Sequence, residues 1–234
     1  MDTLIELGRG PLFRFAVALA VLGLLRHAVL SLWGMRQVLR RAGDKRFALG
    51  PVIQRTLVHL NPVRYFTGNR GVYSILSTLF HVGLILVPIL FAGHIRLWQR
   101  GLGIGWPALP MSVADALTIL TVVTGVLLVV GRAWFVASRE MSRPQDWLLP
   151  PLIAFEFLSG YLLAHPGSNP FDLQLVTLLH VGVGDLLLLV TPFTKIAHCA
   201  MLPFSQLVSE MAWKFVPGAG HDVVKTLGKE GQPI

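Results

Sequence analysis

At 234 residues, the chain is more apolar and less charged than a water-soluble domain of that length. Hydrophobic residues make up 53% of it and charged residues 14%, whereas about a quarter of the residues in soluble domains are charged. The net charge of +8 does not indicate nucleic-acid binding, because most of the 20 Lys and Arg residues flank long apolar blocks. The single cysteine, Cys199, excludes a disulfide or a multi-cysteine iron–sulfur site within the chain.

Five apolar blocks predict five transmembrane helices, since each approaches the length of about 20 residues that a helix needs to cross a bilayer. They cover residues 11–33, 73–98, 113–135, 147–164 and 171–195, and a long basic stretch, 36–70, separates the first two. The predicted fold class is all-α, an integral membrane bundle of five transmembrane helices over residues 1–200. A tail of residues 201–234 follows, and its first part is expected to be amphipathic, with Leu207, Met211, Trp213 and Phe215.

The basic residues predict the orientation of this bundle. Most of them lie in residues 36–70, 132–143 and 195–229, and five spans place these three regions on the same side. The positive-inside rule makes that side cytoplasmic, with the N-terminus outside and the C-terminus in the cytoplasm. No internal repeat is visible in the sequence, which disfavours a transporter built from two inverted halves.

Four of the eight histidines lie in or at the end of the second and fifth predicted spans: His81, His94, His180 and His198. An ionisable side chain inside a bilayer is costly and usually faces a partner, a cavity or a cofactor. Two neutral imidazoles on neighbouring helices can ligate one haem iron from both faces. These histidines are therefore candidate axial ligands of two haem b groups, whereas His59, His165 and His221 are expected in loops.

The spacing of these histidines predicts their pairing. His180 and His198 are 18 residues apart, which corresponds to five helical turns and about 27 Å, so both point to the same face. Pairing by depth joins His81 with His198 on the inner side and His94 with His180 on the outer side. His81 and His94 are 13 residues apart, a rotation of about 220°, so they share a face only if the helix is deformed. Pro88 lies between them and favours such a deformation.

Two sequence blocks are similar to a known family. The residues from Leu179 and His180 through Thr191–Lys195 to His198 and Pro203 resemble the last helix of the respiratory nitrate reductase gamma subunit family. The block from Leu79 to Gly83 and the pair Gly93–His94 resemble its second helix. The separation of His81 and His94 is longer than in that family. It therefore suggests a related membrane cytochrome that pairs with a heterodisulfide-reductase-like iron–sulfur protein, as in sulfite-reduction complexes and some hydrogenases.

The resemblance implies a site and a function. In this family two haem b groups lie between the second and last helices, quinone reacts near the outer haem, and a soluble iron–sulfur subunit docks on the cytoplasmic face. By resemblance, His81 and His198 would ligate the inner haem, His94 and His180 the outer haem, and Gly93 would allow close approach of the outer haem or the quinone. The location implied is the cytoplasmic (inner) membrane of a bacterium or an archaeon.

The function predicted is that of a di-haem cytochrome b subunit, which carries electrons between the quinone pool and a cytoplasmic iron–sulfur oxidoreductase. The basic stretch 36–70 is long enough to be the docking surface, although its charges equally suit a topogenic role and contact with anionic lipid. Two other functions remain open at this stage. One is a membrane anchor or assembly subunit without redox function, and the other is a small transporter that uses Asp185 and Glu156.

Overall fold

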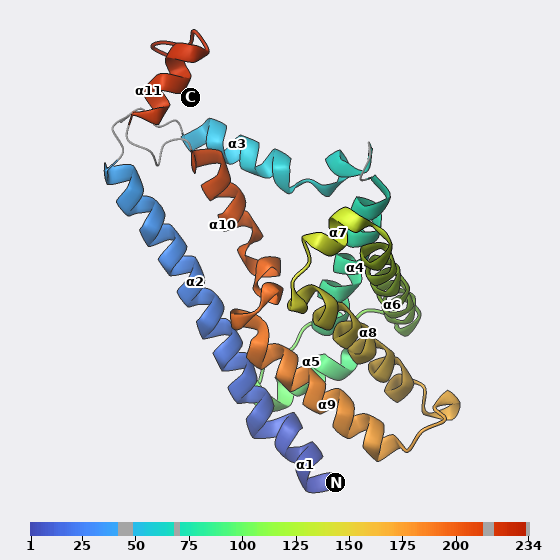
Figure 1. Ribbon diagram of the computed structural model, residues 1–234. Coiled ribbons are helices and arrows are strands. Elements are labelled where there is room, and N and C mark those ends of the chain that lie inside the picture. The colour runs from blue at the N-terminus through green and yellow to red at the C-terminus, as the bar shows by residue number, and fades with distance from the viewer. Residues whose placement is uncertain (42–48, 68–70, 213–217, 233–234) are drawn as a thin grey trace. The chain divides into compact units, whose positions relative to one another are not determined.

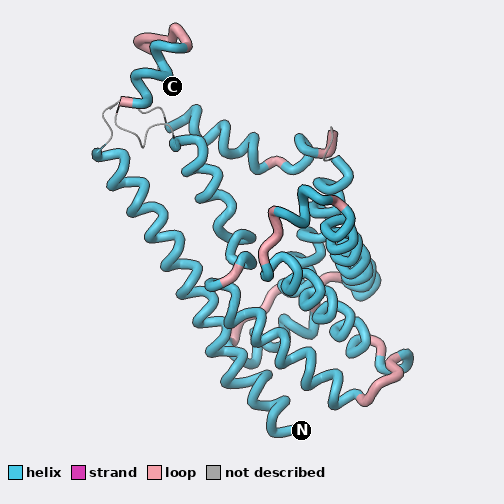
Figure 2. The backbone as a smooth tube through the Cα atoms, viewed as in Figure 1, coloured by secondary structure: helices cyan, strands magenta, loops and turns pink. Residues whose placement is uncertain are grey.

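The computed structural model describes residues 1–41, 49–67, 71–212 and 218–232 (Figure 1). Residues 42–48 and 68–70 of the basic stretch, and Trp213 and Phe215 of the amphipathic segment, lie outside this range. Throughout the described residues the chain forms helices and loops, with no strand (Figure 2). Five helical segments are long and apolar enough to cross a membrane: Asp2–Arg41, Gly71–Leu90, Met111–Trp134, Pro144–Ala164 and Leu173–Phe193. The all-α fold and the five predicted spans are confirmed.

The first of these segments is longer than the predicted span and contains a local irregularity. It begins with α1 (Asp2–Leu7), continues through a π-helical turn, η1 (Gly8–Leu12), and ends with α2 (Phe13–Arg41). Pro11 lies in the π-helical turn and has no backbone N–H to donate, which accounts for the departure from α-helical hydrogen bonding. The polar residues before position 11 therefore belong to the same continuous helical segment.

The chain folds into two compact units. The first unit contains residues Met1–Leu19 and Tyr65–Thr194, and the second contains Ala20–Arg64 and Lys195–Ile234. In the first unit, α4 (Gly71–Leu90) packs against α6 (Met111–Trp134), α6 against α8 (Pro144–Ala164), and α8 against α9 (Leu173–Val190) (Figure 1). The buried centre of this packing contains Phe80, Val87, Ile153 and Phe157.

Helices α4 and α6 approach closely because the facing side chains are small and the polar ones form hydrogen bonds within their own helix. Thr118, Thr121 and Thr124 are buried on α6, and each hydroxyl donates to the backbone carbonyl four residues earlier, at 2.7–2.8 Å. Opposite them, a Cβ atom on Gly83 would overlap the Thr121 hydroxyl and lie 2.8 Å from the Leu117 carbonyl oxygen. Only a residue without a side chain fits there, as is common where membrane helices pack tightly.

The second predicted span is interrupted. Residues 73–98 were expected to form one helix, but they belong to two, α4, which ends at Leu90, and α5 (Ala92–Leu102). Phe91 lies between the two helices in an extended conformation (φ −74°, ψ 131°). The break lies three residues beyond Pro88. Two carbonyl groups that lose their helical donors at the break are bonded elsewhere. The Trp106 Nε1–H donates to the Ile89 carbonyl at 2.8 Å, and the Leu109 N–H donates to the Leu90 carbonyl at 2.9 Å.

The second unit is built around an amphipathic helix that the sequence analysis did not predict. Helix α3 (Leu49–Leu60) lies in the basic stretch and packs against α10 (His198–Met211). A small core joins α3, α10 and the end of α2, and its members are Met35, Leu39, Val52, Leu207, Val208 and Met211. The remaining short elements of the chain are η2 (Pro62–Tyr65), α7 (Val136–Glu140), η3 (Pro166–Ser168), η4 (Thr191–Phe193), η5 (Lys195–Ala197) and α11 (Ala219–Thr226).

The contact at Gly83 predicts a destabilising substitution. Gly83→Ala should lower the melting temperature of the detergent-solubilised protein by several degrees, because overpacking of this kind costs about 1–3 kcal/mol. Gly131→Ala is the matched control, since Gly131 also lies in a helix but has nothing within 4 Å of its Cβ position. That control should leave the melting temperature unchanged or raise it slightly. Equal effects of the two substitutions would contradict the close packing of α4 on α6.

Candidate functional site

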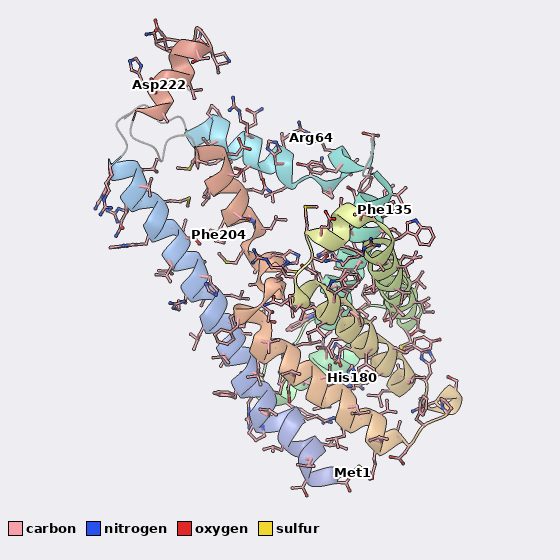
Figure 3. The ribbon with its side chains drawn as sticks, in the orientation of Figure 1. Met1, Arg64, Phe135, His180, Phe204 and Asp222 are labelled. Atoms are coloured by element: carbon pink, nitrogen blue, oxygen red, sulfur yellow. The ribbon has the colours of Figure 1, made fainter. Side chains whose placement is uncertain are left out.

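His180 lies on α9 (Figure 3). It faces α8, where three acceptors surround its Nδ1 atom. The Nδ1 atom is 3.1 Å from the Glu156 carboxylate oxygen Oε1, 3.0 Å from the Ser159 hydroxyl and 3.2 Å from the Glu156 carbonyl oxygen. The Ser159 hydroxyl itself donates to the Glu156 carbonyl at 2.9 Å, so its lone pairs can accept from the imidazole. This environment assigns the proton to Nδ1 and the lone pair to Nε2.

His94 lies on α5, just after the break at Phe91, and its ring is paired with that of His180. The two ring centroids are 6.1 Å apart and the ring planes differ by 11°. The Nδ1 atom of His94 is buried without a hydrogen-bond partner among the described residues. Bonds of about 2 Å from one metal ion to two opposed imidazole nitrogens place the ring centroids about 6 Å apart. The separation of the rings therefore fits ligation of a single iron from both faces.

Two glycines allow the helices to close around His180. A Cβ atom at Gly160 on α8 would lie 3.0 Å from the Cε1 atom of His180, and one at Gly184 on α9 would lie 2.9 Å from the Glu156 carboxylate. Any larger residue would displace the imidazole or its carboxylate partner. Gly93 differs, because the atoms nearest to its Cβ position belong to the Phe91 ring, at 2.8 Å. The expected role of Gly93 in the approach of haem or quinone stays a prediction.

Two acidic side chains accompany His180 inside the apolar segments. Glu156 on α8 contacts the imidazole through Oε1, while its Oε2 atom is buried without a described partner. Asp185 on α9 is 4% exposed, and its Oδ2 atom is also without a described partner. From the sequence, both residues were interpreted only as possible transport residues, and the contact of Glu156 with His180 was missed. The available signal was an acid followed one turn later by Ser159 and Gly160 in an apolar block.

The other two predicted ligands lie in different units. His81 on α4 belongs to the first unit, and its Nδ1 atom is 2.7 Å from the Ser77 carbonyl oxygen. His198 begins α10 in the second unit, and its Nδ1 atom bonds to the Lys195 carbonyl. In both residues this bond assigns the lone pair to Nε2. The pairing of His81 with His198 stays a prediction.

Two histidines expected in loops lie within contact distance of a carboxylate. His59 lies in α3 rather than in a loop, with its Nδ1 atom 2.8 Å from the Glu210 carboxylate on α10. His165 caps the C-terminal end of α8, as expected for a turn residue, and its Nε2 atom is 3.3 Å from the Asp115 carboxylate on α6. These contacts hold helices together within each unit and give neither residue the environment of His180.

Comparison with known proteins identifies a relative but no function. No family model matches the chain, and no solved structure matches it significantly. A protein of Nitratidesulfovibrio vulgaris (strain Hildenborough) is 31% identical over 202 residues, an alignment that covers 84% of this chain and 88% of the relative. The chain belongs to the same family as that protein. The relative carries the name "Protein", which states no activity.

Proposed function

We propose that this chain is a membrane cytochrome b subunit, which holds two haem b groups and carries electrons between the quinone pool and a soluble iron–sulfur partner. The observation that carries this proposal is the pair of His94 and His180, with near-parallel rings and a centroid separation of 6.1 Å. The pair lies among helices that are apolar enough to cross a membrane, where two unligated imidazoles would be costly.

The surroundings of His180 support the same role. A metal-ligating histidine usually donates its second ring N–H to a carboxylate or a carbonyl, and this partner fixes the ring and makes it a more basic ligand. Glu156 and Ser159 supply such acceptors to Nδ1. The Nδ1 atoms of His81 and His198 likewise form hydrogen bonds to backbone carbonyl oxygens. All three histidines therefore carry the tautomer that a haem iron requires.

His94 and His180 would hold the outer haem, and His81 and His198, by the pairing that their spacing in the sequence predicts, would hold the inner one. When bound, the haems supply reversible one-electron reduction and so allow electrons to cross the apolar region. Glu156 keeps the Nδ1 proton of His180 in place and orients its ring. The apolar side chains of Phe80, Phe157 and their neighbours exclude water from the core of the first unit.

The orientation and the partner belong to the same proposal. The N-terminus lies outside the cytoplasmic membrane of a bacterium or an archaeon, and the basic residues face the cytoplasm. The partner is a heterodisulfide-reductase-like iron–sulfur protein, which binds at the basic side. Arg36, Arg40 and Arg41 at the end of α2, with Arg55 and Arg64 around α3, would provide positive charge for that contact.

Haem analysis of single-histidine variants tests the assignment of the ligands. The purified chain should contain two b-type haems by pyridine extraction and by its reduced-minus-oxidised spectrum. His94→Ala and His180→Ala should each remove the same haem, because both would ligate the outer iron. His81→Ala and His198→Ala should each remove the other. His221→Ala in α11 is the control and should keep both.

Two results would count against this assignment. A chain purified in its membrane complex without any b-type absorption would favour a non-redox anchor or a transporter. Loss of the same haem in His81→Ala and His94→Ala would contradict the pairing by depth.

The contact between Glu156 and His180 predicts a change in reduction potential. Glu156→Leu should raise the midpoint potential of the haem held by His180 by roughly 60 mV, because the imidazole loses a hydrogen-bond acceptor at Nδ1 and becomes a less basic ligand. Glu140→Leu, at the exposed end of α7, is the matched control and should leave both potentials unchanged. Redox titration followed at the haem absorption bands measures both variants. An unchanged potential in Glu156→Leu would contradict the role given to this side chain.

A further inference from the structure

A polar pocket lies between the N-terminal helical segment and α9, entirely within the first unit. It has a volume of about 380 Å³. Ile5 and Thr177 form its floor and are buried, and Leu173 adds a further apolar contact. Four polar side chains complete the lining of what we call the α1–α9 pocket: Asp2, Glu6, Arg9 and Gln174.

Helix geometry explains why the charged side chains converge on this pocket. Asp2, Glu6 and Arg9 are separated by four and three residues, so they occupy one face of the first helical segment. Helix α9 lies against that face, and its Gln174 amide donates to the Asp2 carboxylate at 3.0 Å. Figure 1 shows α1 and α9 side by side at this end of the unit.

The two helices that form the pocket run in the same direction. Asp2 is bonded to Gln174, and further along both helices a Cβ atom on Gly8 would overlap the side chain of Val181. The two helices belong to the first and last of the five membrane-spanning segments, and both segments begin at the pocket. The pocket therefore lies where these segments enter the bilayer, at the depth of the lipid headgroups.

Glu6 and Arg9 carry opposite charges in this pocket but do not neutralise each other. Both side chains are exposed, and within the part of the chain that the structure describes neither forms an ion pair or a hydrogen bond. The Gln174 amide has a second N–H, because Asp2 uses only one. The pocket thus presents separate negative and positive groups, which one dipolar ligand can contact together.

We infer that the α1–α9 pocket binds the headgroup of a zwitterionic phospholipid with a primary ammonium group, such as phosphatidylethanolamine. The ammonium group would lie between the carboxylates of Asp2 and Glu6, which can accept its hydrogen bonds. The phosphate would contact the guanidinium of Arg9 and the second N–H of the Gln174 amide. The pocket volume falls in the range of about 300–1,000 Å³ found for small-molecule sites.

The order of the charges along the helix matches the orientation of such a lipid in a bilayer. The phosphate of a phospholipid lies next to the glycerol and the acyl chains, and the ammonium group lies further out, in the water. Arg9 is the charged residue of the pocket nearest to the apolar block 11–33, whereas Glu6 and Asp2 are further from it. Three residues separate Glu6 from Arg9, a rise of about 4.5 Å, which is comparable to the two-carbon link between the ammonium group and the phosphate.

The same groups discriminate against other ligands. Phosphatidylglycerol has a net negative charge and a glycerol group in place of the ammonium, so the two carboxylates would repel it. The trimethylammonium group of phosphatidylcholine has no N–H to donate to them. Soluble phosphoethanolamine has both charges but lacks the acyl chains, which would lie along the apolar block below the pocket, so it should bind only weakly.

Native mass spectrometry of the full-length protein, delipidated in detergent and titrated with single lipids, tests this inference. One phosphatidylethanolamine should bind roughly tenfold more tightly than phosphatidylglycerol, the factor expected for one charge-assisted hydrogen bond. Glu6→Gln should abolish this preference, because the amide does not attract the ammonium group. Arg9→Gln should weaken the binding of both lipids, because both carry the phosphate. Glu140→Gln on α7 and Lys225→Gln on α11 are the matched controls at exposed positions and should change neither affinity.

Thermal unfolding of the same samples gives a second measurement. A headgroup bound across α1 and α9 should raise the melting temperature of the unmodified chain, and phosphatidylethanolamine should not raise that of Glu6→Gln. Equal affinities of the unmodified chain for phosphatidylethanolamine and phosphatidylglycerol would overturn the inference. So would an unchanged preference in Glu6→Gln. Binding of phosphoethanolamine as tight as that of the lipid would also overturn it, because the occupant would then be a soluble molecule.

Discussion

The candidate site depends on one constraint, the interruption of the helix at Phe91, where α4 ends and α5 begins one residue later. On an uninterrupted helix, His81 and His94 would differ by about 220° in direction, and His94 would point away from the face that carries His81. The extended conformation of Phe91 starts a new helix, and on that helix His94 lies parallel to His180. Unpaired carbonyl groups in an apolar environment are costly. The break is tolerated because Trp106 and the Leu109 amide bond to the carbonyls of Ile89 and Leu90.

Much of the fold follows from the sequence, because length and hydropathy determine which segments can cross a bilayer. The five spans were predicted on that basis and are confirmed. A deformation of one continuous helix was predicted near Pro88, but the helix instead ends, and the location of the interruption at Phe91 depends on donors from the loop after α5, which lie 17 or more residues away in sequence. Helix α3 was missed for a related reason. Its helical pattern is short and lies in a stretch dominated by basic and turn-forming residues, and its stability comes from packing against Met35 and Met211.

The candidate site was only partly predictable from the residues themselves. The four histidines stood out because imidazoles are rare in apolar blocks. Glu156 was noticed as a buried acid, but its contact with His180 depends on the rotation of α8 against α9, and two glycines permit that close approach. The pocket between the first helical segment and α9 was not predicted at all. Asp2, Glu6 and Arg9 precede the first apolar block and read as polar flanking residues, whereas in the structure they continue the first helical segment and line the pocket beside α9.

The central claim is that His94 and His180 ligate one iron between near-parallel rings, and electron paramagnetic resonance tests it most directly. The His198→Ala variant should retain only the outer haem, so its oxidised spectrum reports this site alone. Two imidazoles whose planes differ by 11° should give a rhombic low-spin ferric signal, because parallel planes lift the degeneracy of the iron orbitals. A high-spin signal would show that one histidine is not a ligand. A highly anisotropic low-spin signal, typical of perpendicular rings, would contradict the observed geometry.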